Sequence, residues 1–410
     1  MERRLEAADI FRGGGEAFLH QYGKSLSRDQ HRALRAIALC RTQALGGHVE
    51  RCDECGHAKP SYNSCRNRHC PKCQASARAA WMDARATELL PVPYFHVVFT
   101  LPGLLGPLSL QNKKAVYGIL FRAAWETVRD LASDPKHLGA KIAMLSVLHT
   151  WGSNLSHHPH LHCVVPGGGV SPDGERWLSV KQSPKRKSFF LPVRVMSRVF
   201  RGKFLQHLKI AYRKGELKFH GELAVLGDPR QFESLLDRSV RDEWVVYCKR
   251  PFGGPRQVLK YLARYTHRVA IANSRLASYE NGVVRFRWKD YREGGKTKVM
   301  PLTDVEFIRR FLQHVLPAGF VRIRHHGFLA NRNRSDHLQQ CRELLGVKPS
   351  AIPEAVAPSG DIGDEPDAAD VCPNCQSKRL RSFEIQAVRG VPTRLALSLF
   401  AAGTDFQDSS

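Results

Sequence analysis

Two histidines separated by one leucine, His160 and His162, carry the chemistry that is easiest to recognise in this sequence. They lie in a strand-like run, where successive side chains alternate between two faces, so both imidazoles point the same way and can share a metal ion. A hairpin closed symmetrically between Gly152 and Pro159 pairs position 149 with position 162, which predicts His149 as the third ligand. Among 19 histidines in 410 residues about one such pair arises by chance, so the rest of the chain has to support the hypothesis.

His96, on an earlier strand-like run, is the second choice for the third ligand. A lone histidine on an apolar strand is more often packed in a core than bound to a metal. By ligand softness, a set of imidazoles suits Mn²⁺, Co²⁺ or Zn²⁺.

Two Cys-x-x-Cys pairs near the N-terminus predict a structural zinc site. Cys52 and Cys55 are separated by fourteen residues from Cys70 and Cys73, the spacing of two knuckles that hold one tetrahedral Zn²⁺ with four thiolates. Basic residues surround the pairs, so the zinc module either contacts DNA or serves as a scaffold for the next domain. Redox chemistry is less consistent with the sequence, because no thioredoxin-like strand and helix pattern surrounds the cysteines.

Other potential zinc ligands leave alternatives open. Cys65 and His69 lie between the two pairs, and either could replace a thiolate or help to hold a second ion. Cys372 and Cys375 form a third pair near the C-terminus, which is either half of a zinc site completed elsewhere or a remnant.

Two tyrosines four residues apart, Tyr261 and Tyr265, could supply nucleophiles. They lie in a segment with helical periodicity, and residues i and i+4 share one helix face, so both phenols could reach the same site. A tyrosine pair alone is more often part of a core. Here the flanking residues make that face too polar, namely Lys260, Arg264, His267 and Arg268.

The elements that must position these residues alternate between strands and helices. A capped helix is expected over residues 28–45, a buried strand over 94–101 and a helix over 112–131, and the histidine hairpin follows. This β-α-β-β order with short links predicts an α+β fold, in which an antiparallel sheet carries helices on one face. A small zinc-binding domain precedes it.

The chain is too long for one ordinary core, and its composition changes along its length. We expect four regions: an N-terminal helix and zinc-binding domain at 1–90, a catalytic domain at 91–275 with a basic insertion at about 170–250, a basic DNA-binding extension at 276–346, and an acidic linker with a Cys-x-x-Cys tail at 347–410.

The formal net charge of +25 indicates a polyanionic partner, and nucleic acid is the usual one. The start of the chain has no apolar signal core, which predicts a cytoplasmic, nucleoid-associated protein without membrane contact. Basic residues interleaved with aromatic ones suit phosphates and bases. The residues expected to bind DNA are Lys185, Arg186, Lys187, Lys260, Arg264, Arg268, Arg322 and Arg324.

Three motifs in this order, namely the cysteine cluster, the histidine hairpin and the tyrosine helix, resemble the transposases of the insertion sequence 91 family. Those transposases belong to the HUH single-strand endonucleases, named for two histidines that flank an apolar residue. The resemblance covers most of residues 30–345. It implies that His160 and His162 are metal ligands and that Tyr261 and Tyr265 are catalytic.

The resemblance also implies rolling-circle transposition, in which single-stranded DNA is nicked and rejoined at element ends through a 5′-phosphotyrosine intermediate. The expected partners are single-stranded and double-stranded DNA at the element ends and the target, and the expected catalytic metal is Mg²⁺ or Mn²⁺. One alternative is a rolling-circle replication initiator or relaxase, which shares this chemistry. Another is a zinc-dependent DNA-binding regulator without catalysis.

Overall fold

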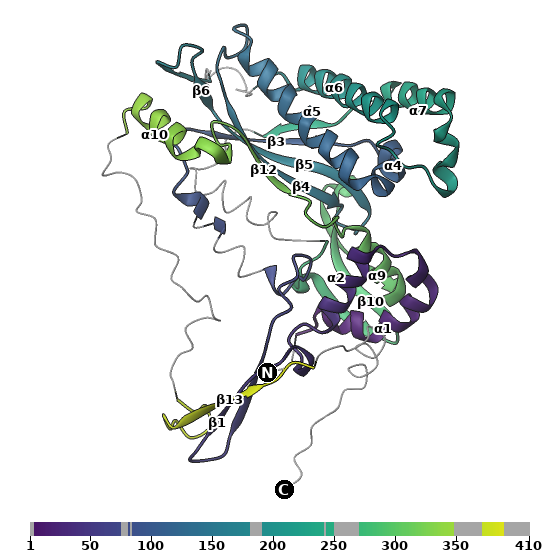
Figure 1. Cartoon of the computed structure of the whole chain (residues 1–410), viewed down its shortest axis with the longest axis vertical. Coiled ribbons are helices and arrows are strands. Elements are labelled where there is room, and N and C mark those ends of the chain that lie inside the picture. Colours follow the sequence, from purple (N-terminus) through teal and green to yellow (C-terminus); the bar gives the residue numbers. More distant parts are fainter. Residues whose placement is uncertain are drawn as a thin grey trace.

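A five-stranded antiparallel sheet in the order β12-β4-β5-β3-β8 forms the centre of the molecule (Figure 1). The computed structural model describes residues 4–74, 81–82, 84–180, 191–241, 243–249, 270–347 and 371–388. The strands of the central sheet are β3 (Tyr94–Thr100), β4 (Ala143–Trp151), β5 (His157–Pro166), β8 (Val246–Lys249) and β12 (Ile323–Gly327).

Three helices, α5, α6 and α7, cover one face of this sheet (Figure 1). Phe95, Val97 and Phe99, which alternate along β3, are buried in the same core as Val116 and Leu120 of α5. The residues between them therefore point to the opposite face, and this face carries the histidines. The helices and the smaller elements around them are α4 (Gly106–Gln111), α5 (Lys113–Ser133), α6 (Val193–Arg213), α7 (Pro229–Arg241) and the hairpin of β6 (Gly168–Val170) with β7 (Trp177–Ser179).

The predicted α+β class, with an antiparallel sheet and helices, is confirmed. The helix expected over 112–131 is α5, and the strand expected over 94–101 is β3. The first capped helix is shorter than expected, because α2 (Arg28–Ala38) ends before Arg41, where the backbone turns with φ of 54°. Its N-terminal cap is as predicted, since the Ser27 side chain accepts a hydrogen bond from the backbone of Gln30.

A second core joins the N-terminal helices to a segment far along the chain. Helix α1 (Ala7–Tyr22) packs on α9 (Asp304–Gln313), and the ring of Phe11 meets that of Phe311 edge to face at 5.1 Å. A Cβ atom at Gly14 would lie 2.5 Å from Cγ of Asp304, so the absence of a side chain permits this close approach. The sheet in this core has the order β11-β10-β9, with β9 (Leu276–Glu280), β10 (Val283–Asp290) and β11 (Lys296–Thr303).

The C-terminal tail returns to the N-terminal region. Strand β13 (Leu380–Ile385) pairs antiparallel with β1 (Gly47–Cys52), and β2 (Ala58–Tyr62) lies on the other side of β1. The resulting three-stranded sheet projects from the lower end of the molecule in Figure 1. Helix α10 (Arg334–Leu344) packs elsewhere, against one end of the central sheet on its histidine face.

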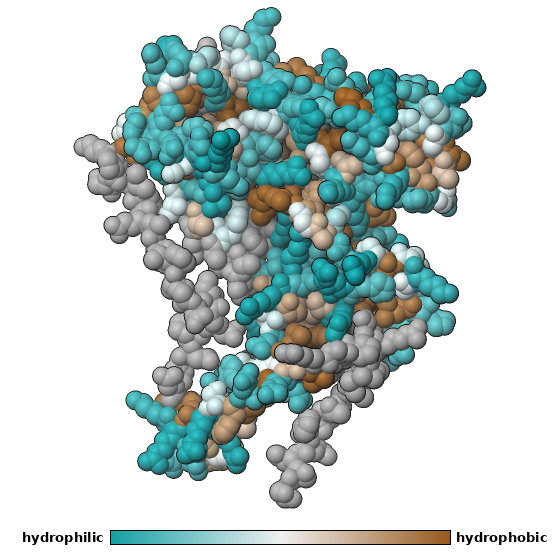
Figure 2. Space-filling model, viewed as in Figure 1, coloured by the Kyte–Doolittle hydropathy of each residue, from teal (hydrophilic) through white to brown (hydrophobic). Residues whose placement is uncertain are grey.

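No helix in the described part of the chain is both long enough and apolar enough to span a bilayer. The face of the molecule in Figure 2 is mostly hydrophilic, with apolar residues in small separate patches.

Candidate metal centre

Three histidines converge on the face of the central sheet opposite α5, α6 and α7. One ring nitrogen from each of His149, His160 and His162 lies within 4.8 Å of the other two. His149 comes from β4 and the other two from β5, and Nε2 of His160 lies 3.1 Å from Nε2 of His162. The structure thus brings together the three residues that the sequence suggested as metal ligands.

The hairpin that carries them differs in register from the prediction. His149 lies opposite His160 rather than opposite His162, because the turn closes sooner than expected, between Gly152 and Ser156, and the ladder shift between His149 and Trp151 offsets only one residue of the difference. Leu155 in this turn has φ of 64°, and it is fully buried. A shift of two residues keeps every side chain on its face, so the three imidazoles still meet.

His96 is not one of the three converging histidines, but it contacts one of them, His162. Its Nε2 lies 2.9 Å from Nδ1 of His162, and the two rings stack in parallel. Nδ1 of His160 lies 2.7 Å from the carbonyl oxygen of His158, to which it donates. In both ligand candidates Nδ1 is therefore engaged, so Nε2 is the atom that remains to face the common centre.

The cluster lies in surroundings that favour neutral imidazoles. Burial lowers the pKa of His160 to about 4 and holds the pKa of His162 well below its usual range. The indole of Trp151 stacks on His149 with 4.5 Å between ring centroids, which adds an apolar wall. A neutral imidazole is the form that binds a metal, so the geometry and the protonation state both fit a divalent cation.

Several predicted site residues lie outside the described part of the chain. The roles of these residues stay predictions: Tyr261, Tyr265, Lys185, Arg186, Lys187, Lys260, Arg264 and Arg268.

The two described arginines from the predicted DNA-binding set do not point to the histidines. The guanidinium of Arg324 lies 4.2 Å from the centre of the Phe121 ring on α5, which places it on the helix-covered face of the sheet. Arg322 donates a hydrogen bond to Gln74, and burial lowers its pKa to about 10. Both therefore help to hold the fold, and DNA contact by either stays a prediction.

The single zinc site predicted from two Cys-x-x-Cys pairs is wrong, because the two pairs belong to different clusters. Cys70 and Cys73 join Cys65 and Cys40, with Sγ atoms 3.5 to 3.6 Å apart. Cys65 was one of the open alternatives, whereas Cys40 was missed because it lies alone just after α2. This set has the four thiols of a structural zinc site.

The other pair, Cys52 and Cys55, meets the C-terminal pair Cys372 and Cys375. Of the two alternatives for the C-terminal pair, the structure favours half of a cluster completed elsewhere. The Asn374 side chain, followed by the backbone of His57, lowers the pKa of Cys55 to about 6.

His69, the remaining alternative, is not a member of either cluster. Its Nε2 accepts a hydrogen bond from the backbone N–H of Leu316 at 3.1 Å, and burial lowers its pKa to about 3. It joins the cysteine-rich segment to the linker that follows α9.

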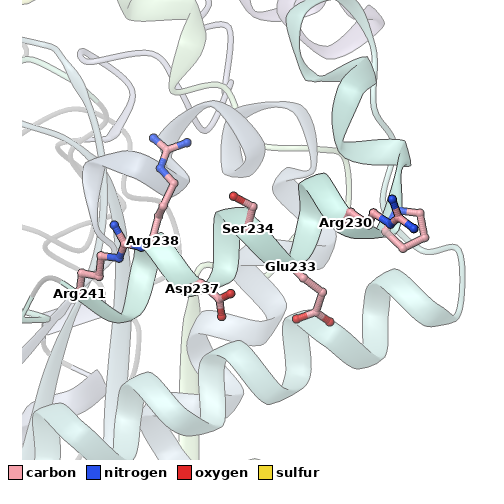
Figure 3. A pocket seen from close by; sticks show the side chains of 7 residues that line it. Arg230, Glu233, Ser234, Asp237, Arg238 and Arg241 are labelled. Atoms are coloured by element: carbon pink, nitrogen blue, oxygen red, sulfur yellow. The ribbon is translucent and has the colours of Figure 1, made fainter.

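An open hollow lies along α7, in the helix layer (Figure 3). One of its carboxylates, Glu233, pairs with Lys209 of α6 at 2.8 Å. The residues that line the hollow are Pro229, Arg230, Glu233, Ser234, Asp237, Arg238 and Arg241.

Comparison with known proteins agrees with this arrangement. The family described as "Transposase zinc-binding domain" matches residues 10–101, and the family described as "Putative transposase" matches residues 143–336, which include the histidine hairpin. No solved structure matches the chain at a significant level.

Two relatives extend the similarity to most of the chain. "Putative transposase y4qJ" from Sinorhizobium fredii is 54% identical over 392 residues, which are 94% of this chain and 97% of the relative. "Transposase for insertion sequence element IS801" from Pseudomonas savastanoi pv. phaseolicola is 29% identical over 312 residues, or 75% of this chain and 72% of the relative. With its zinc-binding region, its histidine hairpin and these relatives, the chain belongs to the insertion sequence 91 family of transposases.

Proposed function

We propose that this transposase nicks and rejoins single-stranded DNA at the ends of its element through a 5′-phosphotyrosine intermediate, and so drives rolling-circle transposition. The observation that carries the proposal is the convergence of His149, His160 and His162 on one face of the sheet, with Nδ1 of the last two engaged by other groups. A cluster that served only packing would not need three ring nitrogens aimed at one point.

The three imidazoles would hold a divalent metal ion, Mg²⁺ or Mn²⁺. When bound, such an ion polarises an oxygen of the scissile phosphodiester and orients the phosphate for in-line attack. The surrounding residues set the orientation and the protonation state of the imidazoles. His96 and the carbonyl of His158 fix the ring orientations of His162 and His160, and burial keeps both rings unprotonated.

Tyr261 and Tyr265 would supply the nucleophiles. A phenol oxygen forms a bond to phosphorus while the bond between phosphorus and the 3′ oxygen breaks. The phenol gives up its proton and the departing 3′ oxygen gains one, so the products are a 5′-phosphotyrosine and a free 3′-hydroxyl. Attack by another 3′-hydroxyl reverses the step and rejoins DNA without ATP, because the phosphodiester is exchanged rather than hydrolysed.

Two other activities would use some of the same residues. A replication initiator or relaxase would share the chemistry and differ in the DNA that it cuts, and the similarity to transposases along most of the chain favours transposition. A DNA-binding regulator would need only the zinc clusters and the positive charge. The converging histidines argue against the regulator, because binding to the DNA backbone needs no such cluster.

A single-stranded oligonucleotide from an element end, labelled in turn at each terminus, tests the chemistry. After incubation with Mg²⁺ or Mn²⁺, the 3′-labelled strand should stay on the protein in an SDS gel, whereas the 5′-labelled strand should give a shorter free fragment. Replacing Tyr261 and Tyr265 together with phenylalanine should abolish the adduct. Tyr291→Phe is the matched control, because Tyr291 is 76% exposed and lies on another element. Absence of any adduct with the wild-type protein would overturn the proposal.

A further inference from the structure

Four thiols from opposite ends of the chain form a second compact cluster. Sγ of Cys52 lies 3.5 Å from Sγ of Cys375, and Sγ of Cys55 lies 3.5 Å from Sγ of Cys372. All four sulfur atoms lie within 4.8 Å of one another. Four thiolates at about 2.3 Å from one tetrahedral Zn²⁺ are about 3.8 Å apart, close to these separations, whereas a disulfide would bring two sulfurs to about 2.05 Å.

The two halves of this cluster are built by the same local turn. The backbone N–H of Gly56 donates to the carbonyl of Cys52, and the N–H of Gln376 donates to the carbonyl of Cys372, at 2.9 and 2.8 Å. Gly56 and Gln376 both have positive φ, 71° and 61°. Each Cys-x-x-Cys pair is thus folded into a knuckle that presents two sulfur atoms to one side. Gln376 adopts a left-handed backbone conformation that is uncommon for a residue other than glycine, and this argues for a defined structural role of the C-terminal pair rather than for a remnant.

Backbone pairing brings the knuckles together. Strand β13 runs antiparallel to β1 with Leu380 opposite Cys52 and Ile385 opposite Gly47, so the knuckle before β13 meets the knuckle after β1. The backbone N–H of Asp53 donates to the carbonyl of Arg379, which extends the contact up to the cluster. The contact also continues past the other end of the strand, where Val388 donates to the carbonyl of Ala44.

We propose that these four cysteines bind a second structural Zn²⁺, separate from the ion of the Cys40, Cys65, Cys70 and Cys73 cluster, and that this ion fastens the C-terminal tail to the N-terminal zinc-binding region. Each of the two sites would hold one Zn²⁺ ion through four thiolates. The second site differs in that 316 residues lie between its two halves. The tail is then an integral part of the zinc-binding domain.

Metal analysis of the full chain tests the stoichiometry. The double variant Cys372→Ser/Cys375→Ser should bind one zinc ion per chain fewer than the wild type, and so should Cys52→Ser/Cys55→Ser. Combining all four substitutions should remove no further ion, because both pairs serve the same site. Cys341→Ser is the control for loss of a thiol outside the clusters, and it should leave the zinc content unchanged. An unchanged zinc content in either double variant would overturn the proposal.

A cut chain tests whether the metal holds the tail. A protease recognition sequence inserted after Gly360 allows the backbone to be cut while both knuckles are kept. The tail fragment should co-elute with the rest of the chain in size-exclusion chromatography when zinc is present, and it should separate after a chelator is added under reducing conditions. Separation in the presence of zinc would overturn the proposal. So would retention after the metal is removed, because pairing of β13 with β1 would then suffice.

Discussion

Nε2 of His96 lies 2.9 Å from Nδ1 of His162, so a residue of β3 sets the orientation of an imidazole on β5. Such a partner behind a ligand fixes its tautomer and its ring orientation, and removing one typically costs about 10-fold to 100-fold in metal affinity or activity. We expect His96→Ala to weaken Mn²⁺ binding by this factor and to lower DNA cleavage at limiting metal. Titration with Mn²⁺, followed by calorimetry and by cleavage, measures both effects.

The choice of variants separates positioning from ligation at this residue. His96→Gln keeps a group that can hydrogen bond and should recover part of the affinity, and excess metal should restore much of the cleavage by either variant. Exposed His137→Ala is the control. Complete loss of cleavage that no metal concentration restores would make His96 a ligand rather than a positioning residue.

Removal of a ligand candidate should have a larger effect. His160→Ala and His162→Ala should abolish cleavage and leave DNA binding largely intact, because phosphate contacts elsewhere supply most of the affinity. His149→Ala should give a weaker loss that added metal partly restores. Parallel gel-shift and cleavage assays make the comparison. Full cleavage by His160→Ala or His162→Ala would remove the proposed metal centre.

Single substitutions of Tyr261 and Tyr265 should show whether transposition needs two nucleophiles or one. If one phenol holds the 5′ end while the other cuts a second position, each single Tyr→Phe variant at Tyr261 or Tyr265 should still form some adduct but lose most transposition in cells. Phenylalanine keeps the ring and removes only the reacting oxygen. Wild-type transposition by one of the single variants would assign catalysis to the other tyrosine alone.

A buried histidine close to the metal centre should make stability depend on pH. Burial lowers the pKa of His314 to about 3 from an ordinary value of 6.5, and its ring bonds to Thr150 and to the carbonyl of Leu155. As the pH falls from 6.5 toward 3, the unfolded chain binds a proton that the folded chain excludes, so the free energy of unfolding falls by up to about 1.4 kcal/mol per pH unit for this group. Urea unfolding at pH 7 and pH 5 should show a smaller difference for His314→Gln than for the wild type. An equal difference would show that His314 does not contribute.

Two glycines in helices should respond to alanine with opposite signs. At Gly14 a methyl group would overlap Cβ and Cγ of Asp304, so Gly14→Ala should destabilise the N-terminal core by about 1 to 3 kcal/mol. At Gly118 in α5 nothing lies within 4 Å of the added carbon, so Gly118→Ala should stabilise the protein by up to about 1 kcal/mol. Thermal unfolding of the two variants gives the comparison. Equal shifts would mean that α1 does not pack closely on α9.

Local patterns were enough to predict the elements around the histidines. The periodicity of α5, the apolar run of β3 and the alternation at His160 and His162 each depend on residues near one another in the chain. The ladder shift near Trp151 was not visible, because turn geometry rather than side-chain pattern sets it. Even so, the error of two residues left His149 on the correct face.

The grouping of the cysteines could not be predicted in the same way. Spacing alone is equally consistent with Cys52 and Cys55 joining Cys70 and Cys73, and the observed partners are set by the pairing of β13 with β1 across most of the chain. Likewise the packing of α1 on α9 depends on a distant contact. Sequence periodicity shows that a face is apolar but not which distant element covers it.

The pairing of β1 with β13 also fixes the order in which the chain can fold as it is synthesised. Cys52 and Cys55 leave the ribosome long before Cys372 and Cys375, and at about 5 to 20 residues per second the delay is roughly 15 to 60 s. During that time only two of the four thiols of this cluster, those of the first knuckle, have been synthesised. Helix α1 likewise cannot pack against α9 until that helix has been synthesised. A chain whose translation stops before Cys372 therefore lacks both the second pair of thiols and the strand that pairs with β1.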